Sequence, residues 1–511
     1  MKIKTSICFL LLLTNFIFLT RAQECNIEWG KEGINKFGKP QYHKFLGNYK
    51  GEIYKFCNNV DNIIETYDLQ DLRLLSSNKI LIPDFGDKNS TSLNQLFLLD
   101  GQLILIFDQV VTKSNAYTRK LESSYKCYGT IIDKNGKPRV DPVLLHEDLQ
   151  KNTYSPTTCS AIMSQDSSIF FFYSGNITDS KIRGKLINKN LATITSNELE
   201  MNFERSYSLS NFMLDKNKIL YCLSKEVLPE TDWFSKKLKK YTNRVMFFNL
   251  NDNKSKKQLI PVKVNQPLTS FHMELHEENI HIVAYHYTGS KHDATGGGVI
   301  YYQFKASNLE LVNSAENEFT STTISQLNAN VKLPNANSFD KTTNAINSLY
   351  NTTILPLKNG DKIIVSEQVV ALDGSTYYGD NYFNILINRI DKNGNVVQNT
   401  VVPKIQAGLT KSFYSFVQFY KNNTLCFLFN DNPKNLNLQD PYKLDGGVAA
   451  EKGTIVVLVT VPENGNWTKK LLYQADNTTP NLYPKECFNM KNGIIIYGQK
   501  GNNIKLAKIN Y

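Results

Sequence analysis

Cysteine and tryptophan are scarce in this sequence, and long apolar runs are nearly absent. Eight cysteines in 511 residues are too few for a disulfide-dense small protein. Only one apolar stretch approaches membrane-spanning length, and its position at the N-terminus excludes a polytopic membrane protein. Aromatic residues are plentiful, with 28 Phe and 27 Tyr, which a disordered chain would not have. The chain is therefore long and apolar enough to fold around a large core or cores.

The first 22 residues have the composition of a secretory signal peptide. Two lysines precede an apolar segment over 7–19, and small residues stand at the cleavage positions within 20–22. An uncleaved anchor is the alternative, which the polar pair at 14–15 disfavours. We therefore expect export, with the mature chain 23–511 secreted, periplasmic or at the cell surface. Cleavage leaves no transmembrane segment and lowers the net charge from +11 to +8, without a basic stripe that would indicate nucleic-acid binding.

The cysteines of the mature chain are odd in number, so at least one is unpaired or bridges to another molecule. They are Cys25, Cys57, Cys127, Cys159, Cys222, Cys426 and Cys487. None has the CxxC spacing of a zinc ribbon or a thioredoxin motif. Cys25 with Cys57 and Cys127 with Cys159 are candidate disulfides. The thiols at 222 and 426 lie inside apolar runs and are predicted to be buried and inert.

One pattern recurs along the chain: a half-apolar stretch, a tight turn and an apolar β-rich run. Turn residues between such runs indicate β-hairpins. The eight turns are Lys50-Gly51, Asp100-Gly101, Gln165-Asp166, Asp215-Lys216-Asn217, Glu278-Asn279, Asn359-Gly360, Asn422-Asn423 and Asn492-Gly493. A second hairpin follows most copies, most clearly at the Asp-Lys-Asn-Gly turns 133–136 and 391–394. Each repeat thus supplies four strands, A to D.

Four antiparallel strands per repeat predict the blades of an all-β propeller. Eight blades are favoured, and seven are the alternative because the polar stretch 313–349 has no assigned place. The last repeat, over 486–510, provides strands A, B and C only, while the segment 25–29 precedes the first repeat. We therefore predict that this N-terminal strand completes the last blade and closes the ring, which removes exposed sheet edges.

With its repeated hairpins and Asp-Lys-Asn-Gly turns, the chain resembles secreted β-propeller proteins, including uncharacterised exported bacterial proteins. The resemblance implies the fold and implies no activity. The boxes that mark sialidase, WD40 and kelch propellers are missing, and the glycine runs Gly296-Gly297-Gly298 and Asp445-Gly446-Gly447 are isolated. Gly-rich nucleotide-binding loops and the His-Glu-x-x-His zinc motif are also missing.

The connections between strands B and C are predicted to be the long ones, and they share one face of a propeller with the D–A connections. We call this the long-loop face. Several of these loops are long: 109–124, 225–242, 368–382 and 432–452. Binding residues concentrate on long loops held by a rigid scaffold. The residues that end strand B would form a ring there: Asp108, Ser174, Ser224, His286, Glu367 and Asp431. The alternative is that each strand simply turns polar where it meets water.

Five of the seven histidines lie close together in one predicted hairpin. With the turn at 278–279, His276 lies opposite His281 and Glu274 opposite Val283, on one sheet face. Imidazoles beside a carboxylate are ligands that Zn²⁺ and Cu²⁺ accept. The candidate metal ligands are His272, Glu274, His276 and His281. A solvated hairpin face is the alternative.

Two further segments contain groups that bind ligands in other proteins. The aromatic and basic segment from Trp233 to Tyr241 is able to contact a membrane surface or an acidic glycan. A short solvated helix or loop packed by Trp233 is the alternative. Asn430, Asp431, Asn432 and Asp440 offer oxygen ligands without the spacing of a calcium loop, so we expect structural turn residues.

Two classes of function follow from these features. The first is a non-enzymatic propeller that binds a protein or glycan through the long-loop face. The second is an exported hydrolase or lyase, with or without a metal ion, in which Asp108, Glu367 and Asp431 supply the acid and base. The lack of a catalytic signature favours binding.

Overall fold

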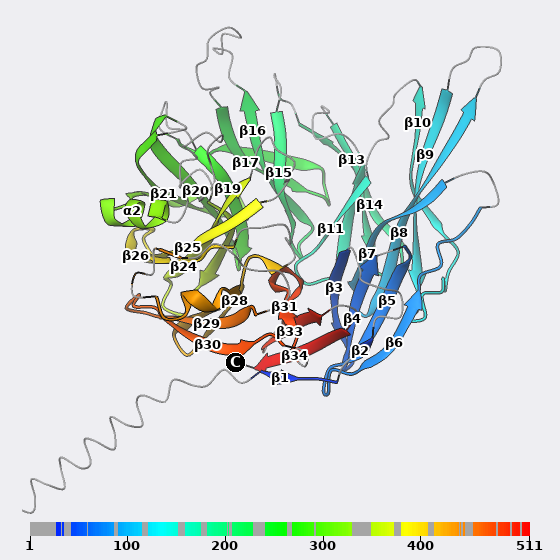
Figure 1. Cartoon of the computed structure of the whole chain (residues 1–511). Helices are drawn as coiled ribbons and strands as arrows, with labels where there is room; N and C mark the ends of the chain where they lie inside the picture. The colour runs from blue at the N-terminus through cyan, green and yellow to red at the C-terminus, as the bar shows by residue number, and fades with distance from the viewer. Residues whose placement is uncertain are drawn as a thin grey trace, which may run out of the picture.

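Eight four-stranded antiparallel blades form a β-propeller in the computed structural model (Figure 1), as predicted. The structure describes residues 27–31, 33–34, 42–58, 60–85, 90–114, 121–151, 159–174, 181–201, 203, 207–227, 241–262, 268–290, 293–329, 349–371, 380–406, 413–438, 440, 443–444, 453–476, 479–490, 493–500 and 503–510. The predicted signal peptide and Cys25 lie outside this part. Among the described residues, no helix has the length and hydropathy needed to cross a membrane.

The first four blades follow the chain without crossovers. Blade 1 contains β3 (Tyr42–Tyr49), β4 (Glu52–Asn58), β5 (Asn62–Asp68) and β6 (Leu74–Lys79). Blade 2 contains β7 (Ser90–Leu99), β8 (Gln102–Ser114), β9 (Leu121–Ile132) and β10 (Val143–Lys151). Blade 3 contains β11 (Cys159–Met163), β12 (Ile169–Ser174), β13 (Lys181–Asn188) and β14 (Thr193–Glu200). Blade 4 contains β15 (Tyr207–Leu214), β16 (Ile219–Val227), β17 (Tyr241–Asn249) and β18 (Lys254–Leu259).

The next three blades repeat the order. Blade 5 contains β19 (Leu268–His276), β20 (Asn279–Ser290), β21 (Asp293–Lys305) and β22 (Leu311–Glu318). Blade 6 contains β23 (Leu349–Pro356), β24 (Lys362–Ala371), β25 (Asp380–Ile390) and β26 (Val396–Val402). Blade 7 contains β27 (Val417–Lys421), β28 (Thr424–Asp431), β29 (Ile455–Pro462) and β30 (Thr468–Gln474). Of the polar stretch 313–349, the described residues belong to the end of β22, to helix α2 (Ser321–Ala329) with the two residues before it, and to the first residue of β23, and 330–348 lie outside the described part.

The ring closes in blade 8 through strands from the two ends of the chain, as predicted. Its C-terminal strands are β31 (Asn481–Leu482), β32 (Phe488–Met490), β33 (Gly493–Lys500) and β34 (Asn503–Asn510). The N-terminal strands β1 (Glu28–Trp29) and β2 (Gly33–Ile34) both pair with β34 in antiparallel fashion. Trp29 packs edge-on against Tyr473 of blade 7, with ring centroids 5.7 Å apart. The closing strand therefore also contributes to the contact between blades.

The predicted turns account for the hairpins. Asp100 and Gly101 both have positive φ, 44° and 79°, which is the backbone of the turn that joins twisted strands tightly. In the Asp-Lys-Asn-Gly turns the aspartate fixes the chain direction: Asp133 Oδ1 accepts from the backbone N–H groups of Asn135 and Lys137 at 2.9 and 3.0 Å. Asp391 makes the same two bonds in blade 6. These local signals explain why the repeat was readable from the sequence.

The core lies between neighbouring blades, where alternate residues of each strand meet those of the next sheet. The cluster between blades 4 and 5, for example, joins Leu223 and Val245 to Ile282 and Tyr302. Cys222 and Cys426 are buried, in agreement with the sequence. The candidate disulfide between Cys127 and Cys159 is wrong in this structure, because both are free and buried. The buried Cys57 is free as well.

Candidate functional site

Four of the B–C connections lie at 115–120, 228–240, 372–379 and 432–454. The first is shorter than the predicted loop 109–124, because β8 continues to Ser114 and β9 begins at Leu121. The D–A connection from β22 to β23, at 319–348, is longer than any of these four. The A–B turns at the opposite ends of the same strands are short, as at 100–101 and 277–278. The basic and aromatic segment from Trp233 to Tyr241 lies outside the described residues except for its last member.

Glu367 lies in the middle of β24 and is held by three donors. Lys404 Nζ and Ser415 Oγ each donate over 2.7 Å, and Asn351 Nδ2 donates over 2.9 Å. The side chains of Glu367 and Lys404 are completely excluded from solvent. Burial lowers the pKa of Lys404, and the neighbouring Glu367 carboxylate opposes that shift.

The connection between blades 6 and 7 is fastened to blade 7 by amide groups. Gln406 Oε1 accepts from Lys404 Nζ at 2.8 Å and from the backbone N–H of Ser415 at 2.7 Å. Gln406 Nε2 donates to the backbone oxygen of Asn430 at 2.9 Å. Asn430 Nδ2 in turn donates to the backbone oxygen of Leu482 in blade 8, at 2.7 Å. A continuous buried network therefore joins three blades near the long-loop face.

Asp431 ends β28 and is also engaged inside the protein. Its Oδ1 accepts from the backbone N–H of Asn432 at 2.8 Å and from Asn435 Nδ2 at 2.7 Å, and its Oδ2 accepts from Lys469 Nζ at 3.0 Å. Asn432 caps the short helix η2 (Pro433–Asn435) that follows. These contacts fit the structural turn role expected from the sequence. Asp440 pairs with Lys443 at 3.2 Å on the surface.

Asp108 belongs to a separate place, in blade 2. Asn94 Nδ2 donates to Asp108 Oδ2 at 2.8 Å and to the backbone oxygen of Cys159 in blade 3 at 3.3 Å. Burial, together with a hydrogen bond to Asp108, raises the pKa of Tyr125. The three predicted catalytic carboxylates thus lie in blades 2, 6 and 7. Glu367 and Asp431 occupy neighbouring blades, and the charges of both act on the amine of Lys404.

The prediction that all ring residues end strand B is wrong for four of them. Only Ser174 and Asp431 end their strands, whereas β8, β16, β20 and β24 continue beyond Asp108, Ser224, His286 and Glu367. The ring residues not yet described have diverse partners. Ser174 Oγ lies 3.1 Å from His146 Nδ1 of blade 2, and Ser224 Oγ donates to the backbone oxygen of Arg244 at 3.5 Å. His286 is completely buried in blade 5.

The histidine hairpin has a different register from the predicted one. His276 pairs with Asn279 and Glu274 with His281, because the turn is Glu277-Glu278, in which Glu277 has a φ of 53°. The predicted opposition of His276 and His281 is therefore wrong by two residues. The shared sheet face is kept, because side chains alternate with a period of two. The rings of His276 and His281 lie 5.6 Å apart.

Glu274 is the centre of this histidine group. It accepts hydrogen bonds from His272 Nε2 at 2.7 Å, from His276 Nε2 at 2.8 Å and from the backbone N–H of Ile354 in blade 6 at 3.0 Å. Burial alone would raise the pKa of Glu274, but the histidine hydrogen bonds hold it at about 2. His281 Nδ1 lies 2.6 Å from the Tyr301 hydroxyl, and burial lowers the His281 pKa to about 3. Metal binding by this group stays a prediction.

A second buried ion pair, which sequence reasoning missed, lies in blade 1. Lys55 Nζ donates to Glu65 Oε2 over 3.1 Å, and the Tyr67 hydroxyl and Cys57 thiol donate to the same oxygen at 2.7 and 3.3 Å. Lys55 Nζ also lies 4.4 Å from the centre of the Tyr497 ring in blade 8. A lysine in the middle of an apolar strand was the signal available in the sequence.

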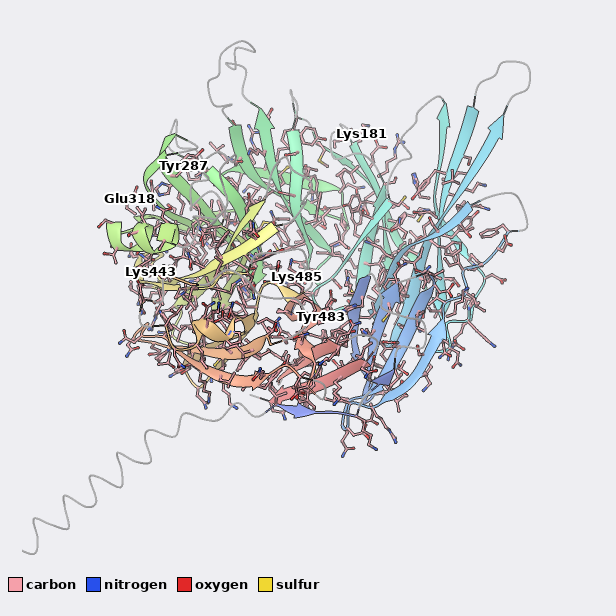
Figure 2. All side chains as sticks on the ribbon, viewed as in Figure 1. Lys181, Tyr287, Glu318, Lys443, Tyr483 and Lys485 are labelled. Atoms are coloured by element: carbon pink, nitrogen blue, oxygen red, sulfur yellow. The ribbon has the colours of Figure 1, made fainter. Side chains whose placement is uncertain are left out.

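Blades 8 and 1 meet at another pair of titratable groups. His43 Nε2 lies 3.4 Å from Glu486 Oε2, and burial raises the pKa of Glu486 to about 7 and lowers that of His43 to about 3. The neighbouring Lys485 is exposed and donates to the Tyr382 hydroxyl of blade 6. Figure 2 shows Lys485 and Tyr483 toward the middle of the ring of blades. A ligand bound at the long-loop face would meet the positive charge of Lys485 here.

A shallow pocket lies on the opposite face, between the short turns of blades 6 and 7. Its lining includes Leu357, Arg389, Gln398, Tyr420 and Glu463. It contains none of the residues predicted from the sequence.

Comparison with known proteins finds only distant structural likeness, with TM-scores below 0.5. No family model matches the sequence, and no curated protein matches it. Among solved structures, the WD40 domain of SCAP from fission yeast is 9% identical with a TM-score of 0.35, over 95% of this chain and 98% of that one. An oligogalacturonate lyase in complex with manganese is 13% identical with a TM-score of 0.33, over 83% and 98%. A polysaccharide lyase is 10% identical with a TM-score of 0.35, over 96% and 93%. Likeness at this level carries no functional argument.

Proposed function

We propose that the chain is an exported interaction scaffold that binds a protein or a glycan through its long-loop face. The observation that carries the proposal is the engagement of Glu367 and Asp431. Each carboxylate is buried and accepts three hydrogen bonds, one of them from a lysine. A carboxylate held in this way is poorly placed to exchange protons with a substrate, because its oxygens already have internal partners.

The same contacts make the strand ends rigid. Gln406 joins the connection between blades 6 and 7 to Asn430, and Asn430 reaches Leu482 of blade 8. Loops that leave such ends are held in place at their bases, which is the usual arrangement of a binding surface on a rigid scaffold.

Charge indicates the kind of ligand. Lys485 is an exposed residue whose amine lies beside the Tyr382 ring, 4.4 Å from its centre, and donates to the Tyr382 hydroxyl. The chain from residue 23 has a net charge of +8, and the loop 228–240 carries four lysines at 236, 237, 239 and 240. These features favour an anionic ligand, such as an acidic glycan or an acidic protein segment.

The test is a binding screen of the chain from residue 23 against acidic and neutral glycans and acidic peptides. We expect an anionic ligand whose affinity falls about tenfold in Lys485→Glu, the change produced by a lost charge contact of about 1.4 kcal/mol. Lys216→Glu is the matched control, because Lys216 is equally exposed but lies on a short A–B turn. Binding that is insensitive to Lys485→Glu would contradict the assigned face. Breakdown of a glycan that stops in Glu367→Gln would instead favour the hydrolase or lyase alternative.

A further inference from the structure

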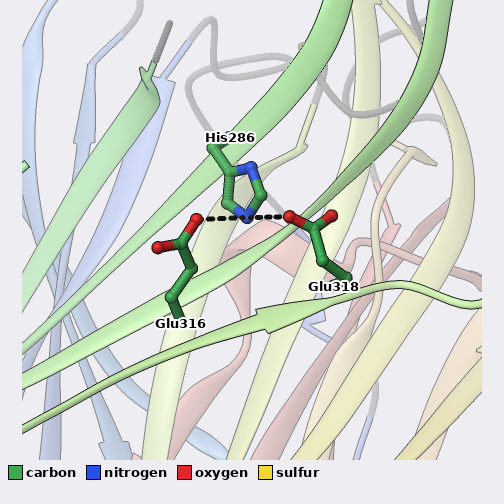
Figure 3. A group of neighbouring side chains, drawn as sticks. All are labelled: His286, Glu316 and Glu318. Atoms are coloured by element: carbon green, nitrogen blue, oxygen red, sulfur yellow. Dashed lines mark ion pairs between the residues drawn. The ribbon is translucent and has the colours of Figure 1, made fainter. Parts of the chain in front are cut away.

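A histidine and two glutamates converge in blade 5, away from the histidine hairpin turn. We propose that His286, Glu316 and Glu318 bind a divalent transition-metal ion, for which Zn²⁺ is the test case. One ligand atom of each lies within 4.8 Å of the others. His286 Nε2 is 3.7 Å from Glu316 Oε1 and 3.8 Å from Glu318 Oε1, and Figure 3 shows the ring directed between the two carboxylates. The proposal is independent of the ligand-binding function.

The sheet register brings the three residues together. His286 of strand β20 pairs with Gly298 of β21, and Gly298 pairs with Glu318 of β22. Glu316 lies two residues earlier on β22, so it is on the same face as Glu318. All three ligands therefore face the same side of blade 5, across the width of three strands.

Gly298 provides the space that the site requires. A Cβ at this position would lie 2.7 Å from His286 Nε2 and 1.9 Å from the backbone oxygen of Asn317. Without a side chain there, the imidazole of His286 reaches across the middle strand toward β22. The last glycine of the isolated Gly296-Gly297-Gly298 run is therefore needed to leave room for the His286 ring.

In blade 3 the same register brings basic side chains to two glutamates. Glu198 of β14 pairs with Arg183 of β13 just as Glu318 pairs with Gly298. Arg183 Nε lies 3.2 Å from Glu198, and Lys181 Nζ lies 2.5 Å from Glu198 and 3.2 Å from Glu200. In blade 5 a glycine stands where blade 3 has the arginine. A bound cation would supply the positive charge that the middle strand of blade 3 provides.

The geometry suits a metal ion closely. Tetrahedral Zn²⁺ with bonds of about 2.1 Å sets its ligand atoms about 3.4 Å apart. His286 Nε2 is within a few tenths of an ångström of that spacing from each carboxylate oxygen, and all three ligand atoms lie within 4.8 Å of one another. One imidazole and two carboxylates form a ligand set accepted by Zn²⁺ and Mn²⁺, and three protein ligands leave a position for water or another ligand.

Solvent reaches the site on one side, and contacts with blade 6 hold its glutamate strand in place. The side chain of His286 is 0% exposed and that of Glu318 is 63% exposed, so an ion can enter from the solvent beside Glu318. Asn317, on the opposite face of β22, accepts from the backbone N–H of Val396 at 2.9 Å and donates to the backbone oxygen of Gly394 at 3.3 Å. These bonds hold β22 against blade 6 and fix where its two glutamates lie.

The test is a titration of Zn²⁺ into the metal-free chain in competition with a chromogenic chelator. We expect one Zn²⁺ per chain, with affinity reduced about tenfold or more in His286→Ala and in Glu318→Gln. Glu318→Gln is informative even if His286→Ala fails to fold, because Glu318 is largely exposed and thermal unfolding will confirm the native fold. Glu198→Gln, at the equivalent place in blade 3, is the matched control and should not change the affinity.

Two results would overturn the proposal. One is the absence of saturable Zn²⁺ binding by the native chain. The other is binding that is unchanged in both His286→Ala and Glu318→Gln, and a loss in His276→Ala would then assign the ion to the group around Glu274.

Discussion

Lys404 Nζ donates to Glu367 Oε1 over 2.7 Å, with both side chains completely excluded from solvent. Removing two charges from water is costly, and the cost is offset only where further hydrogen bonds satisfy both groups. Ser415 and Asn351 donate further hydrogen bonds to the Glu367 carboxylate, and Gln406 accepts one from the Lys404 amine. Because Lys404 belongs to the connection after blade 6, the pair fastens that connection to the middle of strand β24.

The contact between His43 and Glu486 predicts two opposed pH effects. The folded-state pKa of Glu486 is raised from 4.5 to about 7, so its contribution to stability is present at low pH and is lost as the pH rises through 7. The folded-state pKa of His43 is lowered from 6.5 to about 3, so its contribution is present above 6.5 and is lost as the pH falls toward 3.

Urea unfolding of Glu486→Gln as a function of pH measures the first effect. The unfolding free energy of the native chain minus that of the variant should fall by on the order of 2 kcal/mol as the pH rises from about 4.5 to above 7. His43→Gln is the companion variant, and the corresponding difference should change in the opposite direction with pH. A difference that is flat for Glu486→Gln would show that its carboxyl titrates normally.

The closure of the ring predicts an asymmetry between two glycines that adjoin β34. A Cβ on Gly498 would lie 2.5 Å from Pro480 Cγ and 2.8 Å from Trp29 Cη2, whereas a Cβ on Gly33 would meet nothing nearer than 3.7 Å. Gly498→Ala should therefore lower the unfolding free energy by about 1–3 kcal/mol, because it displaces Pro480 and the closing tryptophan. Gly33→Ala is the matched control, and equal losses in the two variants would argue against a tight Trp29 seat.

The cysteines of blades 2 and 3 should remain thiols. A hydrogen bond with Cys159 and burial both raise the pKa of Cys127, and burial raises that of Cys222 to about 12. Thiolates are the reactive form, so alkylation at neutral pH should be negligible in the folded chain and complete after unfolding. Peptide mass spectrometry without reduction checks this, with Cys222 as the internal control. A linked peptide containing Cys127 and Cys159 would restore the disulfide predicted from the sequence.

The fold was predictable because local signals mark its turns. The pairing of segments that are distant in the sequence leaves no such local signal. The turns around Asp100 and Asp133 act within a few residues, so the sequence reveals the strands, the blade count and the ring closure. The register of the histidine hairpin depends on a positive φ at Glu277. Positive φ is uncommon for residues other than glycine, so this turn was not predicted.

The candidate sites depend on pairings across the chain. Glu367 and Asp431 could be named because each follows an apolar run, although only Asp431 ends its strand. Their lysine partners Lys404 and Lys469 lie in segments with no local motif, so the structural use of both carboxylates was hidden. His286 was named as a strand end, but Glu318 joins it only through the register of three strands.

The measurement that tests the account most directly is the unfolding free energy of Glu367→Gln. If the carboxylate is structural, the variant should lose about 3–5 kcal/mol, because Lys404 stays buried without its counter-charge. Glu198→Gln, which removes an exposed pair, is the control and should change stability little. A Glu367→Gln chain as stable as the native chain, or more stable, would contradict the account, because catalytic groups are commonly held at a cost to stability.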